Sequence, residues 1–240
     1  MSFSNFSTTT PQSPAERKLA EIHNQDVAFL FGVFDDSFIN LDDPDTKEKI
    51  MQSLGRVGTE ILDWDDETLL IKACINQHPT HVDFLLAQGA NIHAHGSDDN
   101  TPLHHAARCV PGHDPIRNNG GVCVRTLLAH GADIEAENEE GMTPLAYCLE
   151  YLDLDDLDFG KGLDTRGIVA LIEGGACMDQ PVREGLHACY DSLSDMVLDP
   201  DADFPQEIVD CVRSRLSKRN LVEGLGDTQA QRVTKRGMKL

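Results

Sequence analysis

Apolar residues recur along much of the chain at the three- and four-residue spacing that is typical of amphipathic helices. Val124, Leu127 and Leu128 form one such stripe, and Gly131 follows it at the position where a positive φ ends a helix. Similar segments, in which paired apolar residues precede a Gly-Ala pair, lie at 84–94, 126–136 and 170–180. The pattern therefore predicts short helices that recur at a regular interval.

A second motif precedes these segments and marks the start of another helix in each unit. It consists of a threonine followed by Leu-Leu or Pro-Leu, at Thr68, Thr101 and Thr143. The first interval is 33 residues and the second is 42. Threonine caps a helix well, and Pro102 stands at the first helical position, where its missing N–H costs little. The two motifs predict a repeated unit of two helices, with an insertion that lengthens the second interval.

The segments TPLHHAA at 101–107 and LLAHGADIEA at 127–136 together resemble the ankyrin repeat. The resemblance covers roughly residues 50–180. It implies an all-α fold, an ankyrin-repeat α-solenoid of about five helix pairs with two inserted loops. It also implies that the ring of His104 is structural and bonds backbone groups of neighbouring turns.

Extending the repeat outward gives the domain organisation. We expect one further helix pair at 16–32 and 46–58 and a degenerate last pair at 183–197 and 205–217, because the end units of a solenoid must expose one face to water. The predicted insertions, at 108–121 and 151–167, should lie near one another on one face of the array. The expected parts are a flexible leader at 1–14, an ankyrin-repeat domain with atypical end units at 15–217, and a basic tail at 218–240.

Charge narrows the choice of partner. The net charge is −21. From Arg213 to the C-terminus eight basic residues outnumber two acidic ones, so this stretch carries +6 and the preceding residues carry −27. Such an acidic body repels phosphate backbones, so we expect no nucleic-acid binding by the main domain and favour a basic or mixed-charge protein. Acidity that serves only solubility is an alternative.

Cysteine usage and hydropathy bear on location. The seven cysteines are odd in number and include no CxxC pair, which argues against a disulfide framework and a zinc ribbon. No apolar run approaches the roughly 20 residues of a membrane span, and the Ser/Thr-rich N-terminus lacks the apolar core of a secretory signal. We expect a cytoplasmic protein that is a monomer when free. Secretion into a host cell stays open, because such a leader is compatible with export.

Histidines and cysteines offer only weak candidates for chemistry. His93, His95, His105, Cys109 and His113 fall close together, yet their spacing matches no zinc register. His187 and Cys189 are two residues apart, a spacing at which side chains on a helix diverge. We therefore predict no cofactor, no metal and no catalytic residue. The alternative is an enzyme or metal-dependent protein built on the inserted loops and the Cys and His residues.

The resemblance implies a concave binding surface made of two helix positions in each unit and of the turn tips. The residues expected to bind a partner there are Trp64, Asp65, Asp66, Lys72, His95, Asp98, Asp99, His105, Arg108, Glu137, Glu139, Glu140, Tyr147 and Glu150. Trp64 is the only tryptophan, and it is either an interface anchor or a residue packed under the first helix pair.

The predicted function is a non-catalytic protein–protein interaction module that binds a basic or mixed-charge protein through its concave face and acidic turns. Two narrower roles fit such a small acidic module. One is an immunity-type protein that neutralises a toxin or an enzyme, and the other is a secreted bacterial effector.

Overall fold

The computed structural model describes residues 14–35, 41, 43–108, 119–150, 165–180, 190–202 and 204–219. Helices dominate these residues, and they contain no strand beyond an isolated antiparallel bridge between Leu62 and Thr68. The chain divides into two compact units, at 1–176 and 177–240. The expected leader up to residue 13, the tail from residue 220 and most of both insertions, at 109–118 and 151–164, lie outside the described residues.

The first unit begins with the helix pair expected from the outward extension of the repeat. Helix α1 spans Pro14–Asp35 and helix α2 spans Pro44–Val57. Buried Asp26 of α1 accepts a hydrogen bond from Ser53 over 2.9 Å and two from the Arg56 guanidinium over 2.5 and 2.6 Å. The Arg56 guanidinium and the Ser53 hydroxyl hold the pKa of Asp26 below its usual range, against the opposing effect of burial. This polar contact joins the two helices.

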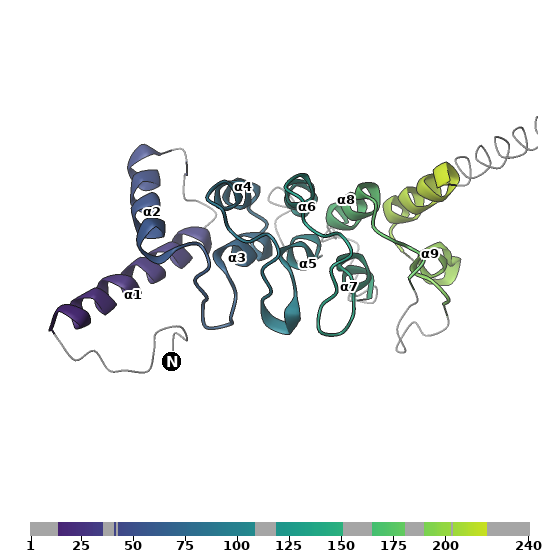
Figure 1. The fold of residues 1–240 in the computed structure, drawn as a ribbon. Helices are drawn as coiled ribbons and strands as arrows, with labels where there is room; N and C mark the ends of the chain where they lie inside the picture. The colour runs from purple at the N-terminus through teal and green to yellow at the C-terminus, as the bar shows by residue number, and fades with distance from the viewer. Residues whose placement is uncertain are drawn as a thin grey trace, which may run out of the picture. The chain divides into compact units, whose positions relative to one another are not determined.

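Three further helix pairs follow in the first unit. They are α3 at Leu69–Ile75 with α4 at Pro79–Ala87, α5 at Pro102–Ala107 with α6 at Gly120–Ala129, and α7 at Pro144–Glu150 with α8 at Arg166–Gly174. Helices α3, α5 and α7 form one layer, helices α4, α6 and α8 form a second, and the turns project from one edge of the stack (Figure 1). The all-α solenoid implied by the resemblance is confirmed.

The sequence signals act locally as predicted. Thr101 is the N-cap of α5, and the Thr68 and Thr143 hydroxyls accept the N–H groups of Ile71 and Ala146, both over 3.3 Å. Gly131 has a φ of 90°, as expected for a residue that ends a helix. The three threonines therefore mark the starts of α3, α5 and α7.

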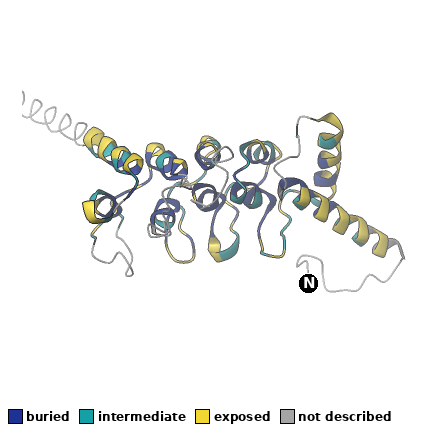
Figure 2. Ribbon diagram, turned by 180° about the vertical axis from the view of Figure 1, so that it is seen from behind, coloured by how far each residue is buried: buried dark blue, intermediate teal, exposed yellow. Residues whose placement is uncertain are grey.

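Apolar side chains from both layers form the core. Figure 2 shows the buried residues, in dark blue, in both layers of helices. Two glycines allow neighbouring helices to approach closely, one between α6 and α8 of the same layer and one between α8 and α5 of different layers. A Cβ on Gly121 would lie 2.7 Å from the Arg166 carbonyl, and one on Gly167 would lie 2.8 Å from the Ala107 carbonyl. Any larger residue at either position must push neighbouring backbone away, so glycine is needed for helix–helix packing.

The second unit contains helix α9 at Leu193–Leu198, the short 3₁₀ helix η2 at Pro200–Ala202 and a helix at 206–219. Ser192 caps α9 by accepting the Asp195 N–H over 3.1 Å. The Arg219 guanidinium donates to Asp179 over 2.5 Å. The expected last pair, 183–197 and 205–217, is thus helical at 193–197 and 206–217, whereas residues 190–192 are not helical and residues 183–189 lie outside the described part. Among the described helices of the chain, none combines the length and the apolar character needed to cross a membrane.

Candidate functional site

Three turns with the same register carry most of the predicted binding residues. They span 63–67, 96–100 and 138–142, and each begins five residues before a capping threonine. The fourth residue of each turn has a left-handed φ, at 60° for Asp66, 60° for Asp99 and 70° for Gly141. The second turn differs at its third residue, where Asp98 also has a positive φ, of 57°. The common register and the shared left-handed fourth residue allow the side chains of the three turns to be compared position by position.

A single acidic side chain organises the first turn. Asp63 Oδ1 accepts the N–H groups of Asp65 and Glu67 over 2.9 and 3.0 Å. The backbone N–H of Asp63 also donates to the Glu67 carbonyl over 3.0 Å, and the Asp66 N–H donates to the Asp63 carbonyl over 3.3 Å. These four hydrogen bonds close the turn on itself.

In the third turn, the side-chain amide of Asn138 accepts backbone N–H groups as the Asp63 carboxylate does in the first turn. Asn138 Oδ1 accepts the N–H groups of Glu140 and Met142 over 3.1 and 3.0 Å, and the backbone N–H of Asn138 donates to the Met142 carbonyl over 3.0 Å. In the second turn the equivalent residue is Gly96, whose N–H donates to the Asn100 carbonyl over 3.0 Å. The closing backbone hydrogen bond is thus preserved in all three turns while the supporting side chain changes.

Lateral hydrogen bonds join the tips into one row. Ser97, in the 3₁₀ helix η1 at Ser97–Asp99, donates its hydroxyl to the Asp65 carbonyl over 2.6 Å. The Glu139 N–H donates to the Asp98 carbonyl over 3.0 Å, which ties the third tip to the second. The carboxylates along this row, which we call the acidic ridge, belong to Asp65, Asp66, Asp98, Asp99, Glu139 and Glu140; all but the half-buried Asp65 are exposed.

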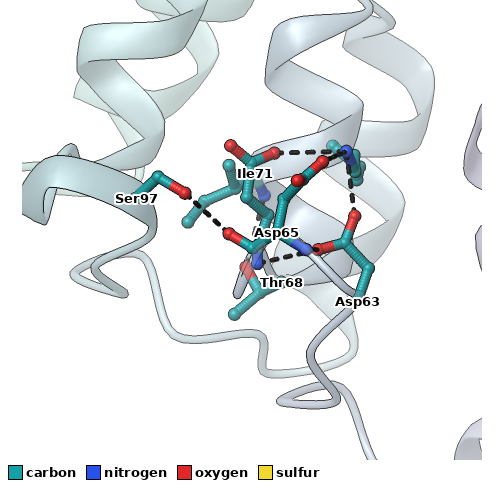
Figure 3. Close-up of polar contacts among 7 residues, drawn as sticks. Asp63, Asp65, Thr68, Ile71 and Ser97 are labelled. Atoms are coloured by element: carbon teal, nitrogen blue, oxygen red, sulfur yellow. Dashed lines mark hydrogen bonds and ion pairs between the residues drawn. The ribbon is translucent and has the colours of Figure 1, made fainter. Parts of the chain in front are cut away.

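Lys72 lies among three carboxylates at the base of the first turn (Figure 3). Its Nζ is 2.9 Å from Asp63 Oδ2, 3.4 Å from Glu67 Oε2 and 3.7 Å from Asp65 Oδ2. Burial lowers the pKa of Lys72, but hydrogen bonding to Asp63 and the charges of Glu67 and Asp63 outweigh it, so the net shift is upward. The ammonium group therefore stays charged and is already engaged within the chain.

Burial has a stronger effect on the pKa of Glu67 than the neighbouring Lys72 has. Desolvation raises the pKa of Glu67, and the nearby ammonium group lowers it only in part. Three carboxylates around one ammonium leave the base of the turn negatively charged overall. The first turn therefore keeps an acidic character in spite of Lys72.

Trp64 stands at the tip of the first turn with 85% of its surface exposed. It does not pack under the first helix pair, so the burial alternative is wrong in this structure. The equivalent residues of the other tips, Ser97 and Glu139, are polar. A large apolar side chain is thus presented to solvent at one end of the acidic ridge.

The adjacent histidines of α5 differ in role. His104 is fully buried, its Nε2 donates to the Met142 carbonyl over 3.0 Å, and its Nδ1 accepts from the backbone N–H and the hydroxyl of Thr101 over 3.2 and 2.8 Å. Burial, the largest effect, lowers its pKa. The expectation that His104 is a structural, hydrogen-bonded residue is confirmed.

His105 was expected to face a partner, but the structure places it in the interior, only 8% exposed. Helix α5 lies between α3 and α7, and every residue from Pro102 to Ala107 is buried. His105 Nε2 has no hydrogen-bond partner among the described residues. Burial lowers the pKa of His105 to about 4, and the charges of His104, Arg108 and Lys72 act in the same direction. Its ring is therefore neutral at pH 7.

The remaining predicted residues lie in varied settings. Arg108 is exposed, and its carbonyl accepts a hydrogen bond from Gln77 over 3.2 Å. Tyr147 is half-buried with its ring edge-on to His104, and burial raises its pKa. His95 is exposed and its Nδ1 lies 3.5 Å from the Asp99 carboxylate. Glu137 is exposed, whereas the Glu150 side chain lies outside the described part.

The described residues offer no group of three or more His, Cys, Asp or Glu side chains placed to hold a metal ion. Of the zinc candidates considered from the sequence, His93 and His95 are exposed and His105 is buried. Cys109 and His113, like the His187 and Cys189 pair, lie outside the described residues.

Comparison with known families gives the same architecture. The family model described as ankyrin repeats in three copies matches residues 45–118, and the model of a single ankyrin repeat matches residues 98–139. Residues 45–139 of the chain are ankyrin repeats. Among curated proteins no match is found. Its ankyrin repeats indicate a protein–protein interaction module, and the turns described above are therefore parts of a binding domain.

Two residues of the site were missed in the sequence. Asp63 and Glu67 hold the first turn and pair with Lys72, yet neither was a candidate. One signal was available, because Asp63 stands five residues before Thr68, as Asn138 does before Thr143. An Asp or Asn in this register predicts a side chain that accepts backbone N–H groups of a turn.

Proposed function

We propose that the protein is a non-catalytic module that binds a basic or mixed-charge protein along the acidic ridge. The observation that carries the proposal is the lateral bonding of the tips, through Ser97 to Asp65 and Glu139 to Asp98, which aligns exposed carboxylates in one row. A row of like charge on an ordered backbone attracts a positive surface and speeds encounter at low salt.

Some helix residues support this surface without contacting the partner. Lys72 is engaged by carboxylates of its own chain, and buried His105 is removed from the expected contact set. Arg108 and Tyr147 remain candidate contacts on the helix side, where the exposed guanidinium fits an acidic group of a mixed-charge partner. The surface therefore combines an acidic ridge with the exposed Arg108 on the helix side.

A charge-neutralised variant tests the proposal. Asp98→Asn, Asp99→Asn, Glu139→Gln and Glu140→Gln together keep the size of each side chain, and asparagine tolerates the left-handed φ of the second turn. Proteins from the native source that are retained by the wild type should be basic or carry basic segments, and the variant should lose them. Their measured Kd should rise with salt.

The control removes the same number of charges elsewhere in the first unit. Glu21, Asp45, Glu48 and Glu173 are exposed and lie off the ridge, so their neutral isosteres change net charge equally. Retention by the control and loss by the ridge variant locates the site, whereas equal retention by both rejects the ridge. The identity of a captured partner would also separate an immunity-type role from an effector role.

A further inference from the structure

The first tip differs chemically from the two tips aligned with it. All three have a left-handed φ at the fourth position, but only the first places an aromatic residue at its second position, where Ser97 and Glu139 stand in the others. Trp64 is the only tryptophan of the chain and is 85% exposed. Large exposed aromatics are unfavourable in water, and tryptophan is enriched among the residues that dominate binding energy.

The turn holds Trp64 in an ordered position before any partner arrives. Asp63 closes the turn from within through its two carboxylate–amide hydrogen bonds, and Ser97 fixes the Asp65 carbonyl from the neighbouring turn (Figure 3). A backbone ordered in advance loses little conformational entropy on binding. The indole is thus presented on a fixed support.

The carboxylates around Trp64 are not equally engaged. Asp63 and Glu67 contact Lys72 at 2.9 and 3.4 Å, whereas Asp65 is more distant at 3.7 Å. Asp66 is exposed, and its carboxylate has no hydrogen bond or ion pair within the described part of the chain. An exposed indole therefore lies two residues from a carboxylate that is available to a partner.

We propose that Trp64, Asp65 and Asp66 form a subsite for an arginine side chain of the partner. This rests on the proposed function, because it names the chemistry that one end of the acidic ridge recognises. In this proposal the guanidinium stacks on the indole face, and its N–H groups donate to the carboxylate that Asp66 exposes on the same turn. Arginine fits better than lysine, since its planar group both stacks on aromatics and binds carboxylates with two hydrogen bonds.

Two peptides of equal charge test the subsite. Fluorescein-labelled hexa-arginine and hexa-lysine are titrated with the protein at low salt, and Kd is measured by anisotropy. The wild type should prefer the arginine peptide, and Trp64→Leu should reduce that preference by about two- to fivefold, the range expected for loss of an exposed cation–π contact. Asp66→Asn should reduce it in the same direction.

A matched variant separates this subsite from the ridge. Glu139→Gln changes the equivalent position of the third tip, so it should weaken both peptides and leave their ratio unchanged. Because the chain has one tryptophan, its emission reports on Trp64 alone and should change on binding hexa-arginine. An unchanged ratio in Trp64→Leu, or unchanged emission in the wild type, overturns the subsite. Failure of the wild type to bind either peptide contradicts the proposed function as well.

Discussion

The first and third turns have the same backbone but are held by different chemistry. The first depends on charges, because Asp63 pairs with Lys72 at the base of the turn. The third depends on neutral groups, since buried Asn138 donates to Asn100 over 3.0 Å and His104 donates to the Met142 carbonyl. The stability of a turn that is held by buried neutral groups should not depend on salt, whereas the stability of a turn that is held by ion pairs should fall as salt is added. Each anchor can be exchanged to test this contrast.

The largest loss in the free energy of unfolding is expected when His104 is replaced. His104→Ala removes the hydrogen bonds to Met142 and Thr101 and leaves a cavity between two repeats, so the free energy of unfolding should fall by about 3 kcal/mol. Urea denaturation followed by circular dichroism measures the change. A loss below about 1 kcal/mol would contradict the view that this ring anchors the third turn.

The next largest loss in the free energy of unfolding is expected when Asn138 of the third turn is replaced by aspartate, the residue at the equivalent position of the first turn. Asn138→Asp keeps the oxygen that accepts two N–H groups, but it places a carboxylate against Asn100 Oδ1 in a buried site. Burying a charge without a cation should reduce the free energy of unfolding by about 2 kcal/mol at pH 7. The same denaturation experiment in 1 M salt should show nearly the same loss, because the site is shielded from ions. A stability equal to wild type would show that the buried position tolerates charge.

Acidification should act through His105, the histidine without a described hydrogen-bond partner. Its pKa is about 4 in the folded chain against 6.5 when unfolded, so the unfolded state binds more protons below pH 6.5. Stability is therefore complete above pH 6.5 and declines as the pH falls toward 4. Protonation of His105 in the unfolded state alone should remove about 1.4 kcal/mol by pH 5.5.

His105→Leu should flatten this dependence. The measurement is the free energy of unfolding at several pH values from 7.5 to 5.5, which stays clear of the calculated pI of 4.6. The difference between wild type and variant isolates His105, because buried His104 titrates in both proteins. Parallel pH curves for the two proteins would show that His105 is not the group that titrates.

These contrasts mark what the sequence could and could not predict. The helix pairs and the threonine caps followed from local motifs, and the role of His104 followed from the resemblance to the ankyrin repeat. The burial of His105 did not, because it depends on α3 and α7, whose residues lie far away along the chain. Lys72 was a candidate contact because the resemblance assigns its helix position to the concave surface, but its carboxylate partners depend on the three-dimensional path of residues 63–67. Local patterns thus identify a residue's position in the repeat, and tertiary packing decides its exposure.

The smallest effect is expected at the charged anchor of the first turn. Asp63→Asn keeps the oxygen that accepts the Asp65 and Glu67 N–H groups and removes only the ionic contact with Lys72. Because Lys72 retains Glu67 at 3.4 Å, the free energy of unfolding should fall by less than about 1 kcal/mol at low salt. In 1 M salt the difference should shrink further, in contrast to Asn138→Asp. No loss at all would mean that hydrogen bonds alone hold the first turn and that the charges around Lys72 contribute to binding rather than to stability, whereas a loss as large as that of Asn138→Asp would contradict the small ionic contribution expected here.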